Sequence, residues 1–328
     1  MMSAPLEVAH PTVSSPYGKP VSGIKMEPKL RIHEVAPRDG LQNESVILPT
    51  SAKLALLQAL VESKPASIEV TSFMRPDKVP QLADADQLVA ELWQQAWAVQ
   101  ARREGMAFAG LVANERGLER LLASGLDTLS LLVSASDSHS RANVGMEVDQ
   151  ALKLNLDLLA TAKREGLQVR AYVSMAFGCP IEGPVEMSRV MELVTAFQAA
   201  EADVVLLADT LGVAKPNQVS ELGRAAMEWL PVERLGLHMH DTYGRALENC
   251  RQALAMGWHH FDSAAGGLGG CPFAPGAAGN LATELWLADL ERNGQAHGMD
   301  KTALLRGVAR LREAAPGWSS RSPKSDAD

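Results

Sequence analysis

Short apolar runs that alternate with amphipathic stretches constrain the fold of this chain more than any other feature. Eight runs rich in Val, Ile and Leu have the length and composition of buried strands. They are Arg31–Val35, Ser67–Val70, Met106–Val112, Thr128–Val133, Val169–Ser174, Val204–Ala208, Arg234–Met239 and Phe261–Ala264. The helical stretches between them include Ser51–Glu62, Gln81–Arg102, Val148–Glu165, Met187–Glu201, Gln218–Trp229 and Gly244–Met256. This alternation predicts a parallel sheet that is buried on both faces.

The number of strand–helix units decides between the parallel folds. Eight units within a chain of 328 residues fit a closed barrel better than an open, doubly wound sheet. We therefore predict an α/β protein with a (β/α)8 TIM barrel over residues 29–315. Residues 1–28 and 316–328 are rich in Pro and Ser, and we expect them to form a disordered extension and a disordered tail.

The composition argues against several classes of function. The formal net charge is −8 and no cluster of Lys and Arg forms a basic surface, so nucleic-acid binding is not expected. No apolar run approaches the roughly 20 residues that a membrane span requires. The three cysteines lie far apart without a CxxC pair, which indicates a reducing compartment. Residues 1–28 contain neither an apolar signal core nor an arginine, and we expect a cytoplasmic protein.

Two histidines at the end of the seventh apolar run predict a metal site. His238 and His240 share one face of a strand, because strand side chains alternate between the two faces. Asp39 follows the first run, and Asn280 could add an amide oxygen. Because the loops after the strands meet on one rim of a TIM barrel, these residues are expected to converge. Oxygen and imidazole ligands without a thiolate favour Mg²⁺ or Mn²⁺ over zinc.

Three charged residues on the same rim are candidates for catalysis. Arg38 precedes Asp39, so its guanidinium could lie beside the metal and stabilise an oxyanion that forms on the substrate. Glu69 ends the second run and could hold Arg38 in place by a salt bridge. Asp209 ends the sixth run, where a structural role and a catalytic role both remain open.

A glycine-rich segment after the eighth run carries Cys271. Residues 266–276 contain five glycines and predict a lid loop, in which the thiol could donate or accept a proton. An inert loop cysteine would be the simpler interpretation. Cys179 follows the fifth run on the same rim and is expected to play a supporting role at most, while Cys250 lies within a helical stretch and is expected to be structural.

Four segments resemble a known enzyme family. They are Val35–Glu44, Glu69–Phe73, His238–Gly244 and Gly266–Asn280. In these segments the chain is similar to hydroxymethylglutaryl-CoA lyases, and the resemblance extends from Leu30 to Glu284. The His-x-His-Asp motif also occurs in Claisen-type synthases, whereas Gly-Leu-Gly-Gly-Cys-Pro followed by Gly-Asn-Leu-Ala-Thr-Glu is characteristic of the lyases.

The resemblance implies a carbon–carbon lyase that cleaves hydroxymethylglutaryl-CoA to acetyl-CoA and acetoacetate by a retro-Claisen reaction. It implies a divalent ion, Mg²⁺ or Mn²⁺, held by Asp39, His238, His240 and Asn280. Arg38 would stabilise the acetyl-CoA enolate, Glu69 would orient Arg38, and His238 or Cys271 would help to protonate the enolate. The resemblance also implies a small-molecule acyl-CoA substrate, a homodimer and a role in leucine degradation.

The chain departs from the family pattern at several positions. Leu206 replaces a small polar residue expected on the rim, residues 134–145 are closer to the synthases, Ser45 stands where lysine is common, and Met175 stands where cysteine is common. These departures leave a related 3-hydroxy-3-alkylacyl-CoA open as the substrate. A Claisen condensing enzyme, an aldolase acting on a hydroxy-keto acid, and a barrel that binds without turnover also stay open at this point. The non-catalytic barrel is disfavoured, because the chain retains Arg38, Glu69 and Cys271 together.

Overall fold

The computed structural model describes residues 30–270 and 278–314, and within them eight parallel strands close into a barrel in sequence order. The strands are β1 (Arg31–Glu34), β2 (Ser67–Ser72), β3 (Ala107–Leu111), β4 (Thr128–Ser134), β5 (Gln168–Ser174), β6 (Val204–Asp209), β7 (Leu235–Met239) and β8 (His260–Ser263). Parallel pairing of β1 with β8 closes the ring, with Arg31 opposite His260. The predicted TIM barrel is confirmed, and each strand lies at its expected place to within a few residues.

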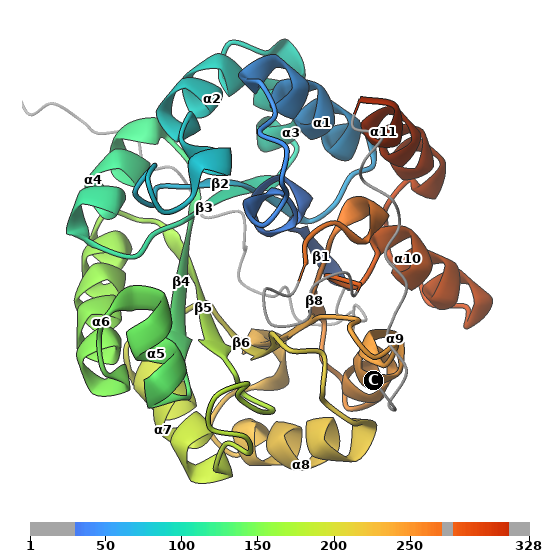
Figure 1. Cartoon of the computed structure of the whole chain (residues 1–328). Coiled ribbons are helices and arrows are strands. Elements are labelled where there is room, and N and C mark those ends of the chain that lie inside the picture. Colours follow the sequence, from blue (N-terminus) through green and yellow to red (C-terminus); the bar gives the residue numbers. More distant parts are fainter. Residues whose placement is uncertain (1–29, 271–277, 315–328) are drawn as a thin grey trace, which may run out of the picture.

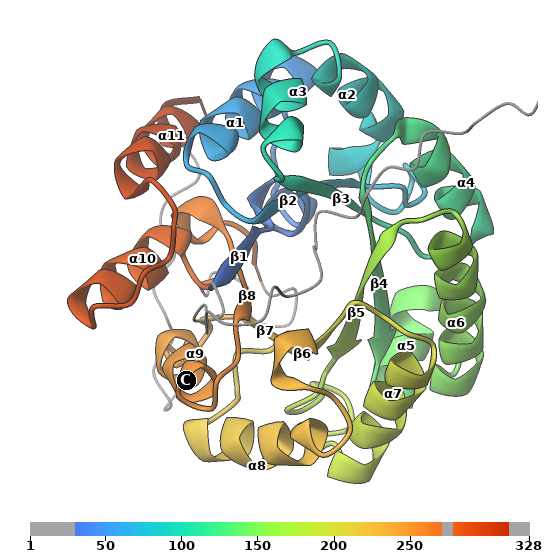
Figure 2. The ribbon, with the colours of Figure 1, turned by 180° about the vertical axis from the view of Figure 1, so that it is seen from behind.

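Helices surround the strands, as Figures 1 and 2 show from opposite sides. They are α1 (Thr50–Glu62), α2 (Ala85–Leu92), α3 (Ala96–Arg103), α4 (Glu115–Ser124), α5 (Asp137–Val144), α6 (Val148–Arg164), α7 (Met187–Ala199), α8 (Pro216–Met227), α9 (Ala246–Ala255), α10 (Thr283–Arg292) and α11 (Lys301–Ala314). Short helical turns are η1 (Ala36–Gly40), η2 (Pro80–Leu82), η3 (Val232–Arg234) and η4 (Ala265–Gly267). Over the described residues, no helix combines the length and the apolarity needed to cross a bilayer.

One expected helix is two helices in the structure. The amphipathic pattern over residues 81–102 predicts a continuous helix, but α2 ends at Leu92 and α3 begins at Ala96. Trp93 lies at the break, where its indole N–H donates to the carbonyl of Ser124 at 2.9 Å and its ring packs edge-on against Phe108. These long-range contacts fix the chain between the two helices, and a helical periodicity cannot reveal them.

The outer faces of the strands form the main hydrophobic core with the helices. Large side chains such as Phe261, Trp258 and Trp286 are fully buried in it. The inside of the barrel is different, because its apolar cluster contains only Tyr172, Val204 and Leu206 among its buried members. Charged and polar side chains therefore occupy much of the barrel interior, where they need partners to offset the loss of hydration.

Candidate metal centre

The loop after β1 is folded so that it presents Arg38 and Asp39 to the barrel mouth. Pro37 is near the start of η1, a π-helical turn, which is a geometry often found at functional sites. Gly40 allows this turn to pack closely, because a Cβ there would lie only 2.8 Å from the Cβ of Leu268. The sequence Pro-Arg-Asp-Gly thus holds two charged side chains in a tight turn against the segment that follows β8.

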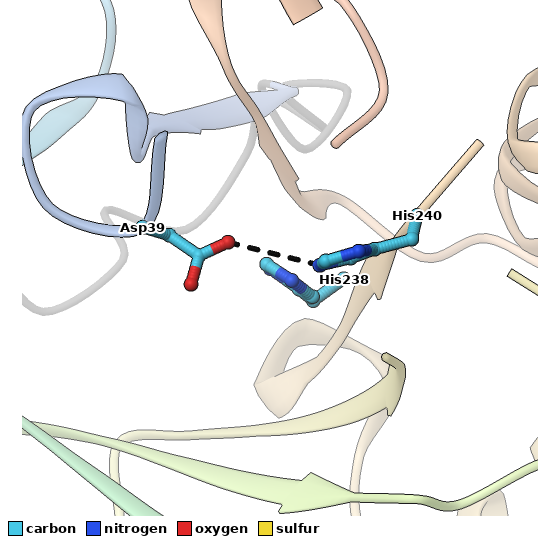
Figure 3. A group of neighbouring side chains, drawn as sticks. All are labelled: Asp39, His238 and His240. Carbon is cyan, nitrogen blue, oxygen red and sulfur yellow. Dashed lines mark ion pairs between the residues drawn. The ribbon is translucent and has the colours of Figure 1, made fainter. Parts of the chain in front are cut away.

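Asp39, His238 and His240 form the cluster that the sequence predicts. Each offers one ligand atom, and these atoms all lie within 4.8 Å of one another. The Nε2 of His240 lies 3.7 Å from Oδ2 of Asp39, the pair joined by the dashed line in Figure 3. The carboxylate of Asp39 points toward the two imidazoles, which come from β7 and the residue after it (Figure 3). Burial opposes the charge of Asp39, but the Arg38 guanidinium and the histidines hold the pKa of this carboxyl well below its usual range.

Asn280 joins this cluster through backbone pairing. The main chain forms an isolated antiparallel bridge between His240 and Asn280, and Asp241 N–H donates to the carbonyl of Gly279 at 2.7 Å. The Asn280 amide Nδ2 donates to Oδ2 of Asp39 at 2.8 Å and to the carbonyl of Leu268 at 3.0 Å. Its Oδ1 is buried without a hydrogen-bond partner among the described residues. The amide is therefore at the site, but it turns its nitrogen toward Asp39.

Arg38 lies between two carboxylates. Its Nε donates to Oε2 of Glu69 at 2.5 Å, and its Nη1 donates to Oδ1 of Asp39 at 2.6 Å. Glu69 is fully buried in β2, and Arg38 is 4% exposed. Burial lowers the pKa of Arg38, but the carboxylates of Glu69 and Asp39 outweigh it and raise that pKa overall. The expected pairing of Arg38 with Glu69 is present, and it fixes the guanidinium beside the cluster.

Sequence reasoning did not identify Asp262, which orients His238. This carboxylate in β8 is fully buried, and its Oδ2 lies 3.1 Å from Nδ1 of His238. It also accepts hydrogen bonds from Nη2 of Arg170 at 2.6 Å and from the hydroxyl of Tyr172 at 2.7 Å. A carboxylate on Nδ1 leaves Nε2 of His238 for a metal, as in many metal sites. An acidic residue inside the apolar run Phe261–Ala264 was the available signal.

Asp209 and Cys271 are the remaining candidate residues. Asp209 ends β6, and its carboxylate accepts backbone N–H bonds from Val213 at 3.1 Å and Ala214 at 2.8 Å, which braces the following loop. Its main-chain carbonyl accepts the N–H of His240 at 3.1 Å. Asp209 therefore holds the loop after β6 and the backbone of His240 in place by hydrogen bonds, while a catalytic role stays a prediction. Cys271 and the centre of the expected lid lie outside the described residues.

The structure corrects the interpretation of one departure from the family pattern. Leu206 is not a rim residue: it is fully buried inside the barrel with Tyr172 and Val204. The alternation along β6 turns its side chain inward, which the sequence motif alone does not show. The segment after β4 forms α5, capped by Ser136, whose hydroxyl accepts the N–H of His139. Cys179 is buried, and its sulfur lies 2.9 Å from the hydroxyl of that same serine.

The donor set fits a divalent cation. A carboxylate and two imidazoles converge, and the buried Asn280 Oδ1 and His240 Nδ1 have no hydrogen-bond partner among the described residues. Rotation of the Asn280 amide would turn an oxygen toward the cluster, and the two amide orientations are interchangeable in shape. Carboxylate, amide and imidazole groups are all ligands that divalent cations accept in proteins.

The sequence matches the model of one protein family, described as HMGL-like, over residues 29–310. The chain is 40% identical over 256 residues to the hydroxymethylglutaryl-CoA lyase of Bacillus subtilis, which covers 78% of this chain and 83% of that protein. It is 37% identical over 256 residues to the mitochondrial hydroxymethylglutaryl-CoA lyase of Bos taurus, again over 78% of this chain and 76% of that protein.

Solved structures agree with these sequence matches. The HMG-CoA lyase structure from Bacillus subtilis has a TM-score of 0.83 and 36% identity, covering 90% of this chain and 95% of that one. An HMG-CoA lyase from Acinetobacter baumannii, solved in complex with coenzyme A and 3-methylmalate, has a TM-score of 0.80 and 33% identity. That match covers 87% of this chain and 90% of the other. The carboxyl transferase domain of Rhizobium etli pyruvate carboxylase, at 15% identity, shares the fold alone.

Proposed function

Because this chain belongs to the HMGL-like family, we propose that it is a divalent-metal-dependent acyl-CoA lyase that cleaves hydroxymethylglutaryl-CoA to acetyl-CoA and acetoacetate. The single observation that carries this proposal is the cluster of Asp39, His238 and His240, with Arg38 beside it, on the barrel of a family whose curated members are named as these lyases. A retro-Claisen cleavage needs both a polarised hydroxyl and a stabilised enolate, and this cluster offers a group for each.

Asp39, His238 and His240 would hold Mg²⁺ or Mn²⁺, with Asn280 as a fourth ligand after rotation of its amide. The ion, when bound, supplies positive charge that lowers the pKa of the substrate's tertiary hydroxyl. Asp262 keeps the Nδ1 of His238 occupied, so His238 would hold the ion through Nε2. The pairing of Arg38 with Asp39 means that the carboxylate is ionised and ready to bind a cation.

Arg38 would stabilise the departing acetyl-CoA enolate. Its Nε is held by the buried Glu69, so the guanidinium keeps its orientation beside Asp39. A fixed cation in a site that excludes water stabilises a developing oxyanion more strongly than it would in bulk solvent. Glu69 thus acts through Arg38, and substitution of either residue would weaken the stabilisation of the enolate.

The proton for the enolate carbon is assigned to Cys271. Nδ1 of His238 already faces Asp262, and its Nε2 cannot bind an ion and carry a proton at the same time. The thiol of Cys271 would give its proton to the enolate carbon and would regain a proton derived from the substrate hydroxyl, so the cycle is balanced. Loss of turnover with retained Mn²⁺ affinity in Cys271→Ala is the expected result, and full activity would remove the thiol from the mechanism.

The decisive experiment is a cleavage assay with Mg²⁺ or Mn²⁺ that follows acetyl-CoA release. Hydroxymethylglutaryl-CoA is offered beside longer 3-alkyl analogues, each with and without EDTA. EDTA-sensitive cleavage of the parent compound is expected. Cleavage of an analogue alone would replace the substrate with a related 3-hydroxy-3-alkylacyl-CoA, and cleavage of neither would favour the condensing direction.

We also propose a cytoplasmic homodimer that acts in leucine degradation. The buried free thiols of Cys179 and Cys250 are consistent with a reducing compartment. Sedimentation velocity of the full chain tests the dimer, and a single species with the mass of a monomer would contradict it. A requirement for the protein during growth on leucine, without a requirement on glucose, tests the metabolic role.

A further inference from the structure

Glu34, the last residue of β1, carries a fully buried carboxylate that takes no part in the proposed chemistry. Its neighbour His33 pairs with Asp262 of β8 and faces the inside of the barrel. Because side chains alternate along a strand, Glu34 points to the outer face of the barrel, where the helices pack. A carboxylate in such a layer needs hydrogen bonds that offset its lost hydration.

Three hydrogen bonds join this carboxylate to three separate segments of the chain. Its Oε1 accepts the backbone N–H groups of Ala36 and Ala265, both at 2.9 Å, and its Oε2 accepts the hydroxyl of Thr283 at 2.8 Å. Ala36 is the first residue of η1, Ala265 is the first residue of η4, and Thr283 is the first residue of α10. One side chain therefore holds the beginnings of two turns and a helix.

Each of these segments leads to the candidate metal centre. The turn η1 carries Arg38 and Asp39. The residue that follows η4 is Leu268, whose carbonyl accepts Nδ2 of Asn280 at 3.0 Å, and Asn280 itself stands three residues before Thr283. Because η1 and η4 bond to the same carboxylate oxygen, Glu34 fixes one turn relative to the other.

The packing between these segments leaves no room to absorb a shift. A Cβ on Gly269 would lie 2.7 Å from Nδ2 of Asn280, and a Cβ on Gly40 would lie 2.8 Å from the Cβ of Leu268. Close-packed interiors have low compressibility and transmit displacements. A change at Glu34 should therefore reach Asn280, although the hydrogen bonds of its carboxylate go to other residues.

We propose that Glu34 is a positioning residue for the metal centre, which sets the geometry of Asp39 and Asn280 by holding η1, η4 and the start of α10 together. The inference rests on the metal binding proposed above, but it does not depend on which acyl-CoA is cleaved. A carboxylate that only stabilised the fold could be lost without changing the metal affinity of the folded protein. Loss of a positioning residue lowers that affinity through ligands that stay in place in the sequence.

Titration of the full chain with Mn²⁺, followed by electron paramagnetic resonance, tests the proposal. Glu34→Ala removes all three hydrogen bonds and should weaken Mn²⁺ binding about tenfold. Glu34→Gln should restore most of the affinity. Its amide oxygen can accept both N–H groups and its NH₂ can donate to Thr283, whose hydroxyl then donates to Ser263, 2.8 Å away.

A second variant tests one of the three bonds alone. Thr283→Val keeps the shape of the side chain and removes the hydroxyl that bonds to Oε2 of Glu34. The two bonds from Oε1 to η1 and η4 remain, so this variant should bind Mn²⁺ with an affinity between those of the parent and Glu34→Ala.

Asp289→Asn is the matched control. Asp289 is buried in α10, the helix that begins at Thr283, but its carboxylate pairs with Arg251 at 2.8 Å. This variant should bind Mn²⁺ like the parent, and an equal loss in Asp289→Asn would reduce the effect at Glu34 to general destabilisation and overturn the proposal.

Two further outcomes separate this inference from the proposed function. Parent-like Mn²⁺ affinity in folded Glu34→Ala would overturn the inference alone, and the same result in Thr283→Val would do so if Glu34→Ala fails to fold. Absence of Mn²⁺ binding in the parent would overturn the proposed metal site together with the inference.

Discussion

Replacing Asp262 with Asn tests how the barrel interior controls the metal site. The change keeps the shape of the side chain and removes its charge. Asp262 accepts hydrogen bonds from Arg170, Tyr172 and His238 at 2.6, 2.7 and 3.1 Å, and it is fully buried. In the variant, the guanidinium of Arg170 would lose its counter-charge, and His238 would lose the carboxylate that fixes its ring.

The expected magnitude follows from these contacts. Loss of one partner from a buried ion pair costs about 3–5 kcal/mol, and the lower value applies here because the Asn oxygen can still accept one hydrogen bond. We therefore expect the free energy of unfolding to fall by about 3 kcal/mol. Loss of a carboxylate behind a metal-binding histidine weakens metal affinity by about 10–100-fold.

Two measurements separate these effects. Urea unfolding of the metal-free protein gives the stability, and Mn²⁺ titration followed by electron paramagnetic resonance gives the metal affinity. Asp86→Asn is the matched control, because Asp86 pairs with Arg120 at 3.0 Å with a side chain 66% exposed. That variant should lose less than about 1 kcal/mol and should bind Mn²⁺ like the parent. Unchanged Mn²⁺ affinity in folded Asp262→Asn would refute the orienting role of Asp262.

Further perturbations test the remaining parts of the structure. Burial raises the pKa of Glu34 from its ordinary value of 4.5 to about 7. As the pH rises from about 4.5 to about 7, this carboxyl therefore ionises in the unfolded chain before it ionises in the folded one. The free energy of unfolding should fall by about 3 kcal/mol over that pH range. Glu34→Gln should lose that part of the pH dependence in urea unfolding, and an unchanged profile would contradict it. Gly279→Ala should weaken Mn²⁺ binding, because the Cβ of the new alanine would lie 1.9 Å from the carbonyl oxygen of Gly269 and would displace Asn280. An Mn²⁺ affinity equal to that of the parent would show that the loop adapts. Arg38→Ala should abolish turnover while Mn²⁺ titration shows retained binding, and retained turnover would exclude the enolate role.

The fold was largely predictable from the sequence because its signals are local. Each strand is an apolar run whose burial on two faces leaves a continuous pattern, and helices such as α6 and α8 carry an amphipathic period. The pairing of Arg38 with Glu69 was predictable for a related reason. Arg38 follows β1, whereas Glu69 lies inside β2 (Ser67–Ser72) and not, as the sequence had indicated, at its end. The two residues still meet, because β1 and β2 are neighbouring strands of the barrel.

The sequence by itself thus determined the barrel and the rim on which the candidate metal ligands lie. It also identified those candidates, Asp39, His238 and His240, whose ligand atoms the structure brings within 4.8 Å of one another. Only the tertiary structure decided which side chains contact these residues from inside the barrel. Arg170 and Asp262 belong to strands that are not neighbours, 92 residues apart, so their bond crosses the inside of the closed barrel. No local period encodes such a contact, because closure and shear of the ring decide which inward-facing side chains meet.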